Sequence, residues 1–380
     1  MRGTRISRGL AGVVFAVATM GATLSAVFAG PVAPAAAATC IPIYVSSSGS
    51  AGTTKLVEFA SGANGNVAPA VIVGGQANST LDTLSGIAQD SSGNTYVALP
   101  NPNAIAVFAP GASGDVAPIS RLVGGNTGLS SPQGIVVKNN KLYVANGPFA
   151  GGGSSGPQSI SVFNLPLAPG INNVAPVAVI AGANTGLDAV FGLAVDSSGN
   201  IFVANLNNKV LEFAPPPPSS YASPTNVAPI FTITTPAPPE GLAIRGTTLY
   251  VSNDNNSITE YSLPSGALIN TISGMATGLA APLGIDVDSS GNVFVVNAGN
   301  QVREFAAGAT GNATAIAVIA GAATQLSSAQ FVYIASCGPV RRPPADFDGD
   351  GKTDVSVFRP GSSIWYIHGS GGSDSATNFG

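Results

Sequence analysis

The sequence predicts an all-β fold: a six-bladed β-propeller closed by a composite N-/C-terminal blade, followed by a short C-terminal β repeat segment. Three observations predict it, namely the composition, a repeated motif and two complementary terminal fragments. Of 380 residues, 8% are charged and 45% are apolar, with 48 Gly and 29 Pro. This composition is typical of short strands joined by tight turns rather than of helices, and its hydrophobicity argues against disorder.

One motif recurs five times along the chain. It consists of a glycine, an apolar strand, a turn and a second apolar strand, as in GLAVDSSGNIFVAN. The copies begin at Gly86, Gly134, Gly192, Gly241 and Gly284, so the spacings are 48, 58, 49 and 43 residues. Each copy continues with a third and a fourth short strand, for example VLEFAP and IFTIT. Four short strands in such a period predict one propeller blade per copy.

Turn residues agree with this assignment. In three copies the first two strands are joined by DSSGN, where the Asp side chain can cap the turn and the Gly can adopt positive φ. KNNK and RGTT replace it in the copies from Gly134 and Gly241 and are also turn sequences. We expect the leading glycine of each copy to lie where the inner strands converge on the axis and a side chain would crowd.

These units resemble NHL-type β-propeller repeats, which read like P-x-G-I-A-V-D-x-x-G-N-I-Y-V-A-N. The resemblance covers roughly residues 40–337. It implies a propeller and leaves the function open, because many activities share this scaffold. We therefore divide the chain into a signal peptide (1–38), an NHL-like propeller (39–338), a linker (339–344) and a C-terminal repeat segment (345–380).

Two terminal fragments complete a sixth blade. CIPIYVSS, from Cys40, matches a second strand, and KLVEFA and PAVIVGG match a third and a fourth. Near the other end, LSSAQFVYIA from Leu326 matches the inner-strand sequence LSSPQGIVVK from Leu129. The sixth blade would thus take its inner strand from the C-terminal side and three strands from the N-terminal side, which closes the ring.

The two cysteines fall at the missing turn of this composite blade. On the repeat alignment Cys337 matches Asn140 and Cys40 matches Asn139, so they would face each other across paired strand ends. We predict a Cys40–Cys337 disulfide, in keeping with export to an oxidising compartment. The alternative is a pair of free buried thiols.

The N-terminus has the pattern of an export signal. Arg2, Arg5 and Arg8 precede the uncharged stretch 9–29, and Ala36 and Ala38 satisfy the A-x-A rule for cleavage after Ala38. Cleavage after Ala29 and an uncleaved membrane anchor are the alternatives. We expect a secreted or cell-surface protein with no membrane span after cleavage. Loss of three arginines takes the net charge from −4 to −7, which leaves no electrostatic footprint for nucleic acid or anionic lipid.

A cation-binding pattern lies in ADFDGDGKTDVSVF. Asp346, Asp348, Asp350 and Asp354 occupy loop positions 1, 3, 5 and 9, and the Lys352 carbonyl could supply position 7. Oxygen ligands at alternate positions of a tight Gly-containing loop can wrap one hard cation; the alternative is a solvated acidic turn. With VFRPGSSIWYIHG, the stretch resembles an FG-GAP/VCBS-type repeat, which implies Ca²⁺ at these four aspartates. One such unit cannot bury its own face, so we expect it to need further repeats or a partner surface.

Binding is the leading functional hypothesis, with an unknown protein or carbohydrate as ligand and no nucleic acid. The one histidine, His368, lies outside the propeller, which excludes a His-dependent triad or a His-ligated zinc site in the ring. Two alternatives are a metal-dependent lyase or lactonase at the axis and a mainly structural surface component. Three or more inward carboxylates or amides at the axis would favour the enzyme, whereas an axis lined with Val, Ile and Ala would exclude it; the predicted inner strands are apolar, so binding leads.

Several polar residues are candidates for such an axial site. Glu240, Asp254 and Asp286 lie in or beside predicted strands. The asparagines that end second strands could ring one face or cap strand ends: Asn146, Asn205, Asn253 and Asn297. Glutamates recur in third strands, where the alternating pattern predicts solvent-facing positions: Glu58, Glu212, Glu260 and Glu304.

Overall fold

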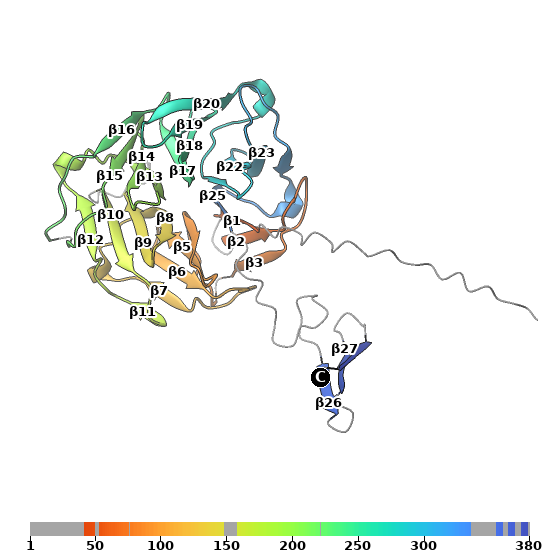
Figure 1. Ribbon diagram of the computed structural model, residues 1–380. Helices are drawn as coiled ribbons and strands as arrows, with labels where there is room; N and C mark the ends of the chain where they lie inside the picture. The colour runs from red at the N-terminus through yellow and green to blue at the C-terminus, as the bar shows by residue number, and fades with distance from the viewer. Residues whose placement is uncertain are drawn as a thin grey trace, which may run out of the picture. The chain divides into compact units, whose positions relative to one another are not determined.

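The computed structural model describes residues 42–49, 53–75, 77–147, 158–220 and 222–335, and the backbone of 355–359, 364–368 and 374–378. Six sheets stand around one axis and form the predicted propeller (Figure 1). In every blade the strands are antiparallel and follow one another from the axis to the rim. We number the blades 1 to 5 along the chain and call the sixth the composite blade.

The strands of each blade are given from the axis outward. Blade 1 contains β4 (Ile87–Gln89), β5 (Thr95–Leu99), β6 (Ala104–Phe108) and β7 (Ser120–Leu122). Blade 2 contains β8 (Pro132–Lys138), β9 (Lys141–Asn146), β10 (Ser159–Asn164) and β12 (Ala178–Ala181). Blade 3 contains β13 (Val190–Val195), β14 (Ile201–Asn205), β15 (Lys209–Phe213) and β16 (Phe231–Thr234).

The remaining blades follow the same order. Blade 4 contains β17 (Pro239–Arg245), β18 (Thr248–Asn253), β19 (Ser257–Ser262) and β20 (Ala267–Ser273). Blade 5 contains β21 (Ile285–Val287), β22 (Val293–Asn297), β23 (Gln301–Phe305) and β24 (Ala317–Ile319). The composite blade contains β25 (Ala329–Ile334), β1 (Ile43–Ser47), β2 (Lys55–Phe59) and β3 (Val71–Gly74).

Short elements complete the chain. Four 3-10 turns follow outer strands: η1 (Gly125–Thr127), η2 (Ala183–Thr185), η3 (Met275–Thr277) and η4 (Ala322–Thr324). A separate antiparallel sheet contains β26 (Val355–Arg359), β27 (Ile364–His368) and β28 (Asp374–Asn378). It agrees with the predicted C-terminal β segment. No helix in the described part of the chain is long and apolar enough to span a membrane.

The DSSGN turns have the predicted chemistry. In blade 3 the Asp196 carboxylate accepts hydrogen bonds from the backbone N–H groups of Ser198 and Asn200, each at 2.8 Å. Asp90 and Asp288 do the same in blades 1 and 5. The turn glycine has positive φ in all three cases, 89° at Gly199. The turn sequence therefore fixes the register of the first two strands.

The hydrophobic core is divided among the blade interfaces. Six buried clusters occur in the described residues, one between each pair of neighbouring blades. Between blades 2 and 3, for example, Ile160 packs with Val203 and Phe213, all fully buried. The second strand of each blade is thus covered on both faces, whereas outer strands such as β16 and β20 stay largely exposed. A buried side chain of this size contributes about 1.5–3 kcal/mol.

A loop from the next blade fastens each of five outer strands. It pairs in parallel with the outer strand, and its Asn or Asp side chain bonds the turn that follows that strand. Asn173 of blade 2 accepts from the Asn126 N–H of η1 at 2.9 Å, and the loop strand β11 (Gly170–Asn172) pairs with β7. The equivalent side chains at the other four junctions are Asn66, Asp115, Asn226 and Asn312. We call these contacts the inter-blade clasps.

The composite blade closes the ring as predicted. Ile43 pairs with Ile334 and Val45 with Val332, in the register given by the repeat alignment. The pairing continues past the end of β25 to Ala335, whose N–H donates to the Pro42 carbonyl at 3.1 Å. Cys40 and Cys337 themselves lie outside the described residues, each two positions beyond this last hydrogen bond. The disulfide therefore stays a prediction.

Replacing both cysteines by serine (Cys40→Ser, Cys337→Ser) should lower the free energy of unfolding. The chain-entropy model gives about 5 kcal/mol for a loop of about 300 residues. The measurement is denaturant unfolding of the protein, produced under oxidising conditions, with and without reductant, with thiol alkylation followed by mass spectrometry. Two alkylated thiols in the unreduced, unfolded protein would contradict the disulfide.

Candidate functional site

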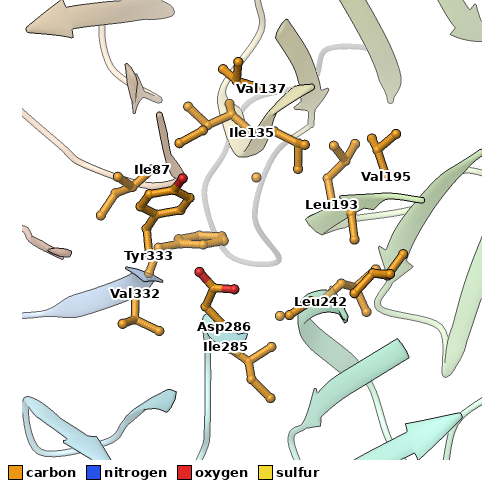
Figure 2. Close-up of a pocket in the computed structure, with 18 of the residues that line it drawn as sticks. Ile87, Ile135, Val137, Leu193, Val195, Leu242, Ile285, Asp286, Val332 and Tyr333 are labelled. Atoms are coloured by element: carbon orange, nitrogen blue, oxygen red, sulfur yellow. The ribbon is translucent and has the colours of Figure 1, made fainter. Parts of the chain in front are cut away.

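An axial pocket of about 530 Å³ lies between the inner strands of all six blades. Most of the side chains that line it are aliphatic, and about half of the surface that it exposes is polar. The first layer after the leading glycines is formed by Ile87, Ile135, Leu193, Leu242, Ile285 and Val332, each of them 5–7% exposed. Figure 2 shows these side chains around the pocket, with Val137 and Val195 further along the same strands.

The backbones of the inner strands converge at one end of this pocket. A Cβ added to Gly134 would lie 2.6 Å from the Phe191 carbonyl oxygen, and one on Gly192 would lie 2.4 Å from the Glu240 carbonyl oxygen. Real Cβ atoms do not approach backbone atoms so closely, so these positions require glycine. This confirms the expectation for the leading glycines.

The composite blade departs from the glycine rule. Phe331 of β25 stands where the other five inner strands have glycine, and its ring meets that of Phe191 at a centroid distance of 4.9 Å. Both rings are at least nine-tenths buried. Phe331 lines the pocket at this end. In the composite blade, therefore, an aromatic side chain packed against Phe191 stands at the position that is glycine in the other blades.

Four polar side chains interrupt the apolar lining: Gln89, Lys138, Asp286 and Tyr333. Asp286 and Tyr333 reach into the same space in Figure 2. Asp286 Oδ2 accepts from the Ile334 N–H at 2.7 Å, and Oδ1 accepts from its neighbour Val287 N–H at 2.8 Å. Asp286 therefore bonds blade 5 to the inner strand of the composite blade while facing the pocket.

Burial determines the electrostatics of these groups. It raises the pKa of Asp286 to about 6, with the backbone hydrogen bonds from Ile334 and Val287 opposing the shift. It also raises the pKa of Tyr333, and the nearby Asp286 carboxylate adds to that increase. Asp286 can thus hold a proton at mildly acidic pH, and Tyr333 stays neutral and able to donate a hydrogen bond.

A shallow groove of about 300 Å³ adjoins the pocket between blades 1 and 2. The two share Gln89, Val137 and Lys138. The groove is otherwise lined by turn and loop residues: Asp90, Ser91, Ser92, Asn139, Asn140, Leu165 and Pro166. The apolar pocket therefore continues into a polar surface at the ends of the inner strands.

Of the three predicted axial carboxylates, Asp286 alone lines the pocket. Glu240 is 8% exposed, and its Oε2 has no hydrogen-bond partner within the described residues. Burial raises the pKa of Glu240 to about 7, and the charge of Asp254 adds to this. No group of three or more His, Cys, Asp or Glu side chains that could hold a metal ion occurs in the described ranges. The enzymatic alternative stays a prediction from the sequence.

The four asparagines at the ends of second strands do not line the pocket. Three of them accept a backbone N–H from the loop that enters their own blade: Asn146 from Ser130, Asn205 from Asp188 and Asn297 from Ala280. In blade 4 the entering loop differs, and Asn253 Oδ1 has no partner in the described structure. Three of these side chains hold loops, and none of the four lines the axial pocket.

The prediction that the third-strand glutamates face solvent is wrong. Glu212 is 5% exposed and Glu260 is 9% exposed, and Glu58 and Glu304 are half-buried. Burial raises the pKa of all four. Third strands are covered by a neighbouring blade on both faces, so alternation along the strand does not separate a wet face from a dry one.

The sequence prediction missed Tyr333 and Phe331. The signal was present in the alignment, since Phe331 replaces a glycine and Tyr333 matches Val136. The calcium-loop residues Asp346, Asp348, Asp350, Lys352 and Asp354 lie outside the described residues, and the structure does not test them.

Comparison with known proteins supports the fold. No family model and no curated protein matches this chain. A chain in the crystal structure of a nidogen/laminin complex is similar, with a TM-score of 0.52 and 11% identity, over 78% of this chain and 99% of that chain. At this identity the likeness shows the fold alone, a β-propeller.

Two further solved structures are similar at lower scores. The WD40 propeller domain of Doa1 has a TM-score of 0.47 and 12% identity, over 74% of this chain and 79% of that chain. The designed protein Ika8 has a TM-score of 0.42 and 10% identity, over 89% and 80%.

Asp286→Asn should change how stability depends on pH. The folded protein holds the Asp286 proton more tightly than the unfolded chain, so this group favours folding at low pH. That contribution is lost as the pH rises through about 6. We expect the wild type to lose about 1–2 kcal/mol relative to the variant between pH about 4 and about 7.5, because the open pocket screens part of the shift. Urea unfolding of both proteins measures it, and parallel pH curves would refute it.

Proposed function

We propose that this chain is an exported module that binds a protein ligand by taking an apolar side chain into the axial pocket. The aliphatic lining carries the proposal. A pocket whose lining side chains are mostly aliphatic, with polar groups among them, suits an apolar side chain whose backbone is bonded at the rim. Gln89, Lys138 and the adjoining groove supply polar contacts for the residues on either side.

A protein ligand fits this surface better than a carbohydrate. Sugars are commonly bound by stacking on exposed aromatic rings. Of the two rings in the pocket lining, Phe331 is buried and Tyr333 is half-buried, and among the side chains that the structure describes the large exposed aromatic residue is Phe231. It lies at the outer rim in β16, away from the residues that line the pocket. The N-terminal signal pattern supports export. The NHL-like and FG-GAP/VCBS-like assignments belong to the same proposal and rest on the sequence motifs alone.

Filling the pocket should weaken binding. Val137 lies in the wall shared by the pocket and the groove, so Val137→Trp would occupy the space of an incoming side chain. Peptides selected on the wild-type protein from a random displayed library should carry an apolar residue. They should bind Val137→Trp at least about tenfold more weakly, a loss of about 1.4 kcal/mol.

Ser198→Trp is the matched control, because it adds the same side chain at an exposed position, in the DSSGN turn of blade 3, that lines neither cavity. Circular dichroism of both variants verifies folding. Peptides that bind wild type and Val137→Trp equally would refute the pocket as the site. Retention of a ligand on a glycan array, with no peptide selected, would favour carbohydrate instead.

The calcium site of the C-terminal segment is also proposed. Replacing two of the four aspartates (Asp348→Ala with Asp350→Ala) should abolish the calorimetric heat of Ca²⁺ binding, because each supplies an oxygen ligand at alternate loop positions. Asp374→Ala changes an acidic residue of the same segment outside the loop and should retain the heat. Unchanged Ca²⁺ affinity in the double variant would contradict the site.

A further inference from the structure

The clasped outer strands share one hydrogen-bond pattern. One residue of the neighbouring loop donates its N–H to a carbonyl of the outer strand. The carbonyl of the same loop residue accepts the N–H of the residue two positions further along the outer strand. Gly114 of blade 1 donates to the Ile72 carbonyl at 2.7 Å and accepts from the Gly74 N–H at 3.1 Å. Three more junctions repeat both bonds, with Gly65, Thr225 and Gly311 in the role of Gly114. At the fifth, β11 pairs with β7 in parallel along three residues.

Blade 3 has no such loop pairing on its outer strand in the described residues. Its outer strand β16 pairs with β15 on one side, and no backbone hydrogen bond from the described residues reaches its other side. The reason lies in blade 4, where the third and fourth strands are joined by the tight turn 263–266 instead of a long loop. This turn packs on the Phe231 ring, since a Cβ on Gly266 would lie 2.3 Å from Phe231 Cε1.

The unpaired groups of β16 can be assigned from the register. Thr235 donates its N–H to Asn208, so Ile233 faces β15 and bonds Val210, and the backbone groups of Thr232 and Thr234 point outward. Ile233 corresponds to Val73 in the composite blade, the buried centre of the clasped position. The Thr232 carbonyl and the Thr234 N–H therefore match the two groups that Gly114 bonds there.

The surface beside this edge is apolar. Ile230 is 58% exposed and Phe231 is 38% exposed, while across the junction Leu268 is 57% and Ile269 is 55% exposed. Both outer strands, β16 and β20, lie at the rim in Figure 1. Exposed aliphatic residues beside an unpaired strand edge are typical of a site where another chain adds a strand.

We propose that the outer edge of β16 binds an extended, uncharged segment of a partner protein, added as a parallel strand. The five clasped edges argue for this occupant. Each of them accepts a single parallel segment, whereas two copies of this chain related by a two-fold axis would pair their β16 strands antiparallel. A small residue would bond Thr232 and Thr234, and its neighbours would cover Ile230 and Leu268. The site is separate from the axial pocket and does not depend on it.

Thr234→Pro tests the proposal because it removes the outward N–H and leaves the bonds to β15 intact. Proline is tolerated at such an edge position, so the blade should still fold. Thr234→Ala is the matched control, since it removes the side chain and keeps the N–H. The probe is a library of short random peptides selected on the wild-type protein and measured by fluorescence anisotropy.

We expect uncharged peptides that bind the wild type and Thr234→Ala alike and Thr234→Pro at least about tenfold more weakly. Val137→Trp should leave them unaffected, which separates this site from the pocket. Absence of any peptide sensitive to Thr234→Pro would overturn the proposal. So would dimerisation of the wild type in sedimentation that Thr234→Pro abolishes, because the occupant would then be a second copy.

Discussion

Five of the six blades depend on backbone groups supplied by a neighbour. The outer strand of a blade would present unpaired N–H and C=O groups to solvent, and at five junctions a loop from the next blade bonds them. The clasp side chain then fixes the following turn, which leads into the next inner strand. Glycines with positive φ, such as Gly182 and Gly321, make room for it, since an added Cβ would lie 2.5 Å from the clasp side chain. One local interaction thus sets both the spacing of the blades and the path between them.

This dependence explains why the sequence predicts the ring so well. The repeat alignment placed the composite blade in its observed register because strands have a period of two and a shift of one residue would turn each buried side chain outward. The leading glycines were predictable for a similar reason, since converging backbones leave no space for Cβ. Both features follow from local geometry that the repeat carries from blade to blade, with Phe331 of the composite blade as the exception to the glycine.

The candidate site was less predictable because it depends on departures from the repeat. Phe331 and Tyr333 break the pattern in one blade, and their neighbours Phe191 and Asp286 come from other blades. The prediction that the third-strand glutamates face solvent was wrong for a different reason. Alternation predicts exposure only where a sheet has a wet face, and propeller blades cover both faces of their third strands. The clasp motif NVAP or DVAP recurs in four loops, but its role requires knowing which strands become neighbours.

Asp286 connects the pocket to the closure of the ring. The composite blade is assembled from both ends of the chain, so its inner strand has no hairpin turn to hold it to β1. The Ile334 N–H of this inner strand donates to the Asp286 carboxylate of blade 5. The same carboxylate is the acidic group in the pocket lining. A ligand that displaced the Ile334 N–H from this carboxylate would break a bond between blade 5 and the composite blade. An aliphatic side chain makes no such demand, because it fills the space between the six walls and leaves the bond in place. The chemistry that closes the ring therefore also favours apolar occupants of its centre.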